Sequence, residues 1–127
     1  MVKEEQGKRI LIVDDDAETS NILDSMLTRK KFIVEKAGNG KEALEKIKKN
    51  KPDLILLDYI MPVMDGFETW CQLKSNPQTQ NIPIILCTAT HIEEGENGRI
   101  KVSDYLEKPF TIEEACKKIN KILKKTG

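Results

Sequence analysis

Three short runs of the sequence contain only apolar residues, and polar residues follow each run closely. These runs are Ile10–Val13, Leu54–Leu57 and Ile84–Cys87. Wholly apolar runs of this length are typical of strands that are covered on both faces, as in parallel sheets. The rest of the chain must therefore supply helices for both faces of a sheet.

Segments with apolar residues at helical spacing separate these runs. Their apolar residues lie within Ile22–Leu27, Ala43–Ile47, Phe67–Leu73 and Ile112–Leu123. Two more mixed stretches, Phe32–Val34 and Tyr105–Leu106, fit further strands. The alternation of strand and helix predicts an α/β fold, a doubly wound five-stranded parallel sheet with helices on both faces. The three apolar strands should be central and the two mixed strands should form the edges.

Finer features of the sequence give further expectations. Ile22, Leu23, Met26 and Leu27 share one face of a helix that starts near Asp16. Thr111 and Glu114 have the spacing of a capping box at the start of the last helix. The three cysteines lack metal-ligand spacing and fall in apolar patterns, so we expect small buried side chains at Cys71, Cys87 and Cys116.

Length and composition exclude several classes of protein. The chain has 127 residues, which is enough for one domain with a real core and too few for two. Its 21 basic and 21 acidic side chains balance, and no aromatic residues are interleaved with the lysine clusters, so nucleic-acid binding is not expected. The sequence has no apolar signal segment and no run of membrane-spanning length, which predicts a cytoplasmic protein without membrane contact.

Polar side chains that follow the predicted strands should meet at one edge of the sheet, because parallel strands all end at the same side. Asp14 and Asp15 follow the first apolar run, Asp58 follows the second, and Thr88 follows the third. Lys108 follows the last predicted strand at the same edge. The sequence thus predicts a cluster of three carboxylates, one hydroxyl and one ammonium group.

Three adjacent carboxylates repel one another, and two unit charges about 4 Å apart cost roughly 4 kcal/mol at an effective dielectric near 20. A hard divalent cation with oxygen ligands relieves this repulsion, and Mg²⁺ fits best because it combines one or two carboxylates with phosphate oxygens. Such a cluster suits phosphoryl transfer, in which a carboxylate attacks and cations neutralise the phosphoryl oxygens. A purely structural acid cluster paired to lysine is the alternative, although such clusters stabilise proteins weakly.

Four motifs resemble those of receiver domains in two-component response regulators. They are Ile10–Asp16, Leu57–Gly66, Pro83–Ala89 and Tyr105–Phe110. Together, and in this order on the expected strand ends, they are highly specific, and the resemblance extends from about Arg9 to Leu123. It implies a single receiver domain over residues 1–127 and the flavodoxin-like strand order 2-1-3-4-5.

The resemblance also implies roles for individual residues. Asp58 would be the phosphoacceptor and would touch an Mg²⁺ or Mn²⁺ ion. Asp15 would bind this ion directly, Asp14 would bind it through water, and the backbone carbonyl of Ile60 would complete the protein ligands. The domain would be a signalling switch and not an enzyme with a separate substrate, since it would catalyse only its own phosphorylation and dephosphorylation.

Further implied roles concern signal output. Thr88 would bind a phosphoryl oxygen, Lys108 would pair with the phosphate, and Tyr105 would turn inward when Thr88 moves. The Lys108–Pro109 peptide bond would be cis. The implied partners are a histidine kinase or phosphotransfer protein and an unknown downstream protein, which would bind the face formed by the fourth helix, the fifth strand and the fifth helix.

The sequence departs from the usual pattern of the family at several positions. Lys101 and Val102 stand where the family often has Gly-Ala, and the stretch from Thr88 to Lys108 is shorter by about two residues. None of these departures removes a member of the acid, hydroxyl or lysine set. Positions 60 and 90, which commonly influence dephosphorylation rate in the family, hold isoleucine and threonine.

Two other functions compete with the receiver interpretation. A haloacid-dehalogenase-like phosphatase also uses an aspartyl phosphate, but its nucleophile would be Asp14, and Glu18 stands where its motif has Thr or Val. The short chain also leaves no room for a cap domain. A pseudo-receiver that only binds proteins is the second alternative. The sequence does not decide between a stand-alone receiver and a fragment of a longer protein.

The segment from His91 to Lys101, where receivers place their fourth helix, departs most from the family. Gly95 and Gly98 each cost a helix about 0.8–1 kcal/mol relative to alanine, and Ile92 and Ile100 offer few apolar anchors. We therefore expect the fourth helix to be short or irregular. We expect His91 to be a surface loop residue.

Overall fold

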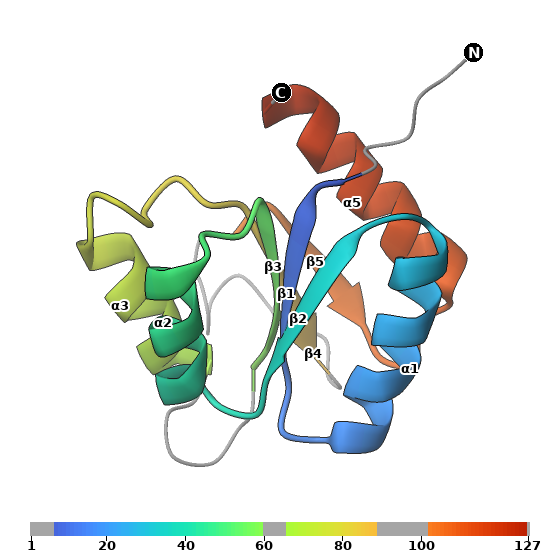
Figure 1. The fold of residues 1–127 in the computed structure, drawn as a ribbon, viewed down its shortest axis with the longest axis horizontal. Coiled ribbons are helices and arrows are strands. Elements are labelled where there is room, and N and C mark those ends of the chain that lie inside the picture. The colour runs from blue at the N-terminus through green and yellow to red at the C-terminus, as the bar shows by residue number, and fades with distance from the viewer. Residues whose placement is uncertain (1–6, 60–65, 89–101, 127) are drawn as a thin grey trace.

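A five-stranded, fully parallel sheet forms the centre of the protein (Figure 1). The structure is a computed structural model and describes residues 7–59, 66–88 and 102–126. The strand order is β2-β1-β3-β4-β5, as the resemblance implies. The strands are β1 (Arg9–Val13), β2 (Ile33–Ala37), β3 (Leu54–Asp58), β4 (Ile84–Thr88) and β5 (Asp104–Glu107).

Helices cover both faces of this sheet, with α1 and α5 on one face and α2 and α3 on the other (Figure 1). Their bounds are α1 (Ala17–Arg29), α2 (Gly40–Lys49), α3 (Gly66–Ser75) and α5 (Ile112–Thr126). The predicted doubly wound α/β fold is confirmed. The segment predicted as a short or irregular fourth helix, residues 91–101, lies outside the described residues.

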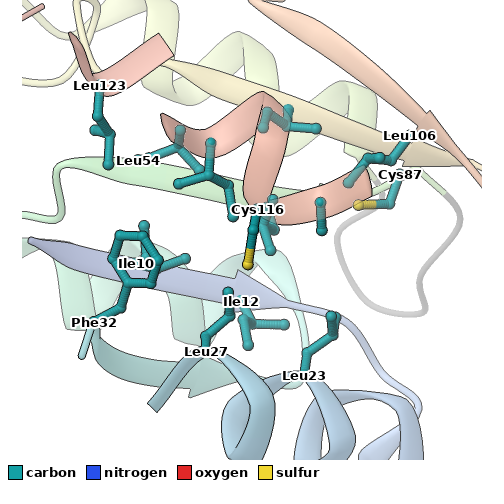
Figure 2. Close-up of a cluster of buried hydrophobic side chains, with 14 residues drawn as sticks. Ile10, Ile12, Leu23, Leu27, Phe32, Leu54, Cys87, Leu106, Cys116 and Leu123 are labelled. Atoms are coloured by element: carbon teal, nitrogen blue, oxygen red, sulfur yellow. The ribbon is translucent and has the colours of Figure 1, made fainter. Parts of the chain in front are cut away.

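Each central strand contains a wholly apolar run because its successive side chains enter two different cores. In β1, Ile10 and Ile12 join the core beneath α1 and α5, whereas Leu11 and Val13 join the core beneath α2 and α3. Figure 2 shows the first of these cores, in which Cys116 of α5 lies above β1. The central and edge positions predicted for the strands are therefore correct.

The edge strand β2 differs in position from its prediction. The mixed stretch Phe32–Val34 was expected, but the strand runs from Ile33 to Ala37, and Phe32 is a buried core residue before it. The polar residues Glu35 and Lys36 kept the second half of the strand from being predicted. An edge strand is only partly covered, so it tolerates such side chains.

The starts of two helices agree with the polar residues in front of them. Asp16 is the N-cap of α1 and accepts a hydrogen bond from the Glu18 N–H at 3.1 Å. The capping box before α5 is confirmed, since the Glu114 N–H donates to the Thr111 hydroxyl at 3.1 Å and the Thr111 N–H donates to Glu114 at 3.2 Å.

Two burial predictions are only partly correct. Cys87 and Cys116 are buried, but Cys71 on α3 is half-buried. On α1, Leu23 and Leu27 are buried, whereas Ile22 and Met26 on the same apolar face are exposed. Among the described residues, no helix has the length and apolar character needed to cross a membrane.

Candidate functional site

The site lies where three neighbouring strands end. Asp14 directly follows β1, Asp58 is the last residue of β3, and Thr88 is the last residue of β4. Val13 is in register with Leu57, and Asp58 is in register with Cys87, so the three strand ends are adjacent. The topology therefore brings polar groups to one edge even though their strands are separated in sequence.

Three carboxylates lie together at this edge. Asp14, Asp15 and Asp58 each offer one oxygen atom, and these atoms lie within 4.8 Å of one another. Asp14 and Asp58 are buried, with 6% and 8% of their surfaces exposed, whereas Asp15 is exposed. Two deep carboxylates and one at the solvent rim fit a hard cation that takes oxygen ligands and keeps several waters.

Among the described residues, Lys108 supplies the ammonium group that pairs with these acids. Its Nζ atom lies 3.2 Å from Asp58 Oδ1 and 3.4 Å from Asp14 Oδ2. The Lys108 backbone N–H donates to the Thr88 carbonyl at 2.7 Å, which ties the residue to the end of β4. The Lys108–Pro109 peptide bond is cis, as the resemblance implies.

The electrostatics of the site show that its negative charge is not balanced. Burial, followed by the neighbouring charge of Asp14, raises the pKa of Asp58, although Lys108 acts in the opposite direction. Burial alone would lower the pKa of Lys108, but the two carboxylates beside it outweigh burial and raise that pKa. One ammonium group is thus shared by two buried carboxylates, and Asp58 remains costly to ionise. An added cation would remove this cost.

The orientation of Asp14 is fixed by the start of α1. Its Oδ1 atom accepts a hydrogen bond from the Asp16 backbone N–H at 2.9 Å. Asp16 itself is turned toward the helix, where its carboxylate accepts a hydrogen bond from the Thr19 hydroxyl at 2.6 Å. This hydrogen bond and those from the helix N–H groups lower the pKa of Asp16. The third acid of the Asp14–Asp16 run therefore caps a helix.

Gly66, the last residue of the second motif and the first of α3, packs closely against the end of β3. Its N–H donates to the Tyr59 carbonyl at 2.8 Å, so the start of α3 lies against the residue that follows Asp58. A Cβ atom at this position would lie 2.7 Å from Tyr59 Cα and 2.8 Å from the Asp58 carbonyl oxygen. Glycine is required by this close approach, and the Asp65–Gly66 dipeptide was the available sequence signal.

The remaining predicted site residues are Thr88, Tyr105 and Ile60. Thr88 is buried at the end of β4, with 5% of its surface exposed. Tyr105 lies on the edge strand β5 and is 39% exposed. Ile60, the expected source of a carbonyl ligand, falls among residues that the structure does not describe.

Comparison with known proteins places this geometry in a family. The response regulator receiver domain matches residues 10–120, which cover all the strand ends described above. The chain belongs to the response regulator receiver family. Receiver domains are components of two-component systems, generally bind Mg²⁺ at an acidic pocket, and interact with histidine kinases or phosphotransfer proteins and with downstream effectors.

Similar proteins include much longer chains. Hybrid signal transduction histidine kinase D of Dictyostelium discoideum is 41% identical over 115 residues, which are 87% of this chain and 7% of that protein. Response regulator PleD of Caulobacter vibrioides is 41% identical over 107 residues, which are 80% of this chain and 23% of that protein. The chain thus spans less than a quarter of either relative.

A solved structure of similar size is also close in fold. The chemotaxis protein CheY4 of Vibrio cholerae superimposes with a TM-score of 0.85 and 30% identity, covering 91% of this receiver and 98% of that chain. The receiver fold with sheet order 2-1-3-4-5 is therefore shared with an experimentally determined relative.

Proposed function

We propose that this receiver is a phospho-accepting switch that takes a phosphoryl group from a phosphohistidine donor onto Asp58. The observation that carries the proposal is the sharing of the Lys108 ammonium by two buried carboxylates at the strand ends. A carboxylate oxygen of Asp58 would attack phosphorus while the phosphorus–nitrogen bond of the donor breaks. With the other ring nitrogen of the donor histidine protonated, the products would be neutral imidazole and an acyl phosphate.

Asp14, Asp15 and Asp58 are the residues that would hold Mg²⁺ or Mn²⁺, and the family resemblance adds the Ile60 carbonyl. The ion would supply positive charge to the phosphoryl oxygens. Lys108 is placed to pair with the phosphate, because its Nζ atom already lies 3.2 Å from Asp58. Thr88 would donate its hydroxyl to a phosphoryl oxygen.

The output of the switch would pass from Thr88 to Tyr105. Attraction of the Thr88 hydroxyl toward the phosphoryl group would open space that the exposed ring of Tyr105 can fill, which is a two-state element biased by one charge. The downstream partner would bind the face of β5 and α5, together with the segment where the family has its fourth helix. We further propose that residues 1–127 act as one receiver domain, which catalyses only its own phosphorylation and dephosphorylation.

A groove beside the acid site supports docking of the phosphodonor there. This groove has a volume of about 390 Å³, and Lys108 lines it together with residues of α1 and of the loop before α5. The other lining residues are Thr19, Ile22, Leu23, Pro109 and Phe110. Because Lys108 belongs to both the groove and the acid site, a helical phosphodonor seated in the groove would have its histidine next to Asp58.

Ile22 tests this docking surface. It is 55% exposed on the rim of the groove, and Ile33 on β2, which is 44% exposed, is the matched control. Ile22→Ser should slow transfer from a phosphotransfer protein that phosphorylates the wild type, while labelling by acetyl phosphate and the behaviour of Ile33→Ser stay unchanged. Equal slowing by both variants, or none by Ile22→Ser, would remove the groove from the proposal.

Phosphorylation by a small donor tests the central proposal. Acetyl phosphate with Mg²⁺ should give one labile acyl phosphate, and mass spectrometry should locate it at Asp58. Chelation of Mg²⁺ and the Asp58→Asn substitution should each abolish the label. Persistent single-site labelling at Asp14 would instead support the phosphatase alternative, and a folded protein without any label would support the pseudo-receiver.

A further inference from the structure

At the outer edge of β5, side chains form hydrogen bonds with the main-chain N–H and carbonyl of Tyr105. In the described part of the chain, β5 is the last strand of the sheet, so it pairs with β4 on one side and has an open edge on the other. The Tyr105 N–H donates to a side chain, and the N–H and carbonyl of one strand residue point the same way. The N–H and carbonyl of Tyr105 are therefore assigned to the outer edge.

Both of these outward groups have partners. The Tyr105 N–H donates to Asp104 Oδ1 at 2.7 Å, and the Tyr105 carbonyl accepts a hydrogen bond from Lys118 Nζ of α5. Lys118 Nζ also lies 3.3 Å from the same Asp104 oxygen, so one ion pair links the two contacts. Asp104, Lys118 and the main chain of Tyr105 form a closed set, which we call the edge clamp.

The Tyr105 side chain is left outside this set. It is 39% exposed, although its main-chain donor and acceptor are both held. A residue held in this way can turn its ring about χ1 without releasing its backbone. Its N–H is already engaged and its carbonyl already has one partner, so pairing with a strand from another chain is disfavoured here.

We propose that the edge clamp makes Tyr105 a fixed pivot and closes the sheet edge there, so that a partner at this face is recognised through side chains and not by an added strand. Asp104 and Lys118 are then positioning residues for Tyr105. The part of this inference that concerns turning of the ring rests on the proposed function, whereas closure of the edge does not.

Amide hydrogen exchange of the unphosphorylated protein tests the clamp directly. Asp104→Ala should speed exchange of the Tyr105 amide by about three- to tenfold, the factor for one lost hydrogen bond. Asp104→Asn keeps an acceptor oxygen and should lose little protection. Lys118→Ala should also speed exchange, and Lys117→Ala, at an exposed neighbour on α5, should not. Unchanged Tyr105 exchange in both Asp104→Ala and Lys118→Ala would overturn the clamp.

A second measurement tests the pivot in the full chain. Beryllofluoride with Mg²⁺, used as a phosphoryl mimic, should change the NMR signals of the Tyr105 ring and leave protection of its amide within about twofold of the resting value, a change smaller than that for a lost hydrogen bond. Loss of this protection on activation would overturn the fixed pivot. Failure of the mimic to bind Asp58 would count against the proposed function, and the resting-state exchange would still decide the clamp.

Discussion

Two lysines near β5 contact aspartates at almost the same distances. Lys108 approaches Asp58 and Asp14 at 3.2 and 3.4 Å, and Lys118 approaches Asp104 at 3.3 Å. Their burial is very different. The side chains of Asp14 and Asp58 are 5% and 11% exposed, whereas those of Asp104 and Lys118 are each 36% exposed.

The difference shows that burial, and not distance, decides what such a contact does. At the acid site, two of the carboxylates are buried, so charges interact more strongly than in water and an added phosphoryl group changes a larger electrostatic energy. At the edge clamp, solvent screens the ion pair, which is worth about 0.2–1 kcal/mol. The contacts of Lys108 are suited to chemistry, and the contact of Lys118 is suited to holding the Tyr105 backbone in place at the surface.

Of the substitutions that test this difference, Lys108→Ala should have the largest effect. It removes the ammonium shared by two buried carboxylates, so phosphorylation should no longer produce the Tyr105 response, even where Asp58 is still labelled. Tyr105 ring signals before and after acetyl phosphate measure the response. Lys118→Ala should leave labelling intact. A Lys108→Ala protein with wild-type spectral changes would contradict the role of Lys108.

Gly66→Ala tests how tightly the acid site is packed. Its Cβ atom would lie 2.7 Å from Tyr59 Cα, so main-chain atoms must shift, at a cost of about 1–3 kcal/mol of unfolding free energy. Gly38→Ala is the matched control, because its Cβ would make an ordinary contact 3.5 Å from Glu42 Oε1. Urea unfolding of both variants decides the matter, and equal stabilities would show that the Gly66 contact is not restrictive.

Asp58→Asn should reveal the cost of the buried charge. Because the pKa of Asp58 is raised in the folded protein, the stability that this carboxyl contributes is fully present below its ordinary pKa and is lost as pH rises through the raised value. Without divalent metal at pH 7, Asp58→Asn should therefore be more stable than the wild type by about 0.5–2 kcal/mol.

The pH series provides the control for this substitution. Near pH 3 the advantage of Asp58→Asn should shrink, since the carboxyl is then protonated in both folded and unfolded chains. Glu45→Gln, at an exposed position of α2, should show no comparable trend. Saturating Mg²⁺ should stabilise the wild type and reduce the difference. A wild type that is more stable than Asp58→Asn at pH 7 without metal would contradict this account.

The sequence predicted the acid site better than it predicted the edges, for a physical reason. Central strands must be apolar on both faces and end at one side of the sheet, so the positions of Asp14 and Asp58 follow from the runs before them. Edge strands need not be apolar on both faces, so β2 contains Glu35 and Lys36, and only its first half was predicted. The Lys118 contact, between a strand edge and a distant helix, leaves no periodic signal.

The sequence pattern also did not predict which apolar residues of α1 are buried. Ile22 and Met26 have the same spacing as Leu23 and Leu27, so periodicity assigns all four to one face. In the structure, Leu23 and Leu27 face the core, and Ile22 and Met26 remain exposed. Apolar residues at an interaction surface cannot be distinguished from core residues by spacing, because both satisfy the same pattern.

The separation in sequence between the members of the acid site has a consequence for how the protein is made. Lys108 lies 94 positions after Asp14 and 50 positions after Asp58. Contacts between distant positions carry a high loop-closure entropy and form late in folding. Until β5 pairs with β4, a nascent or partly folded chain lacks the ammonium that its acids need. Coupling of phosphorylation to the Tyr105 response should thus appear only when synthesis and folding have passed the last strand, which keeps unfinished chains from signalling.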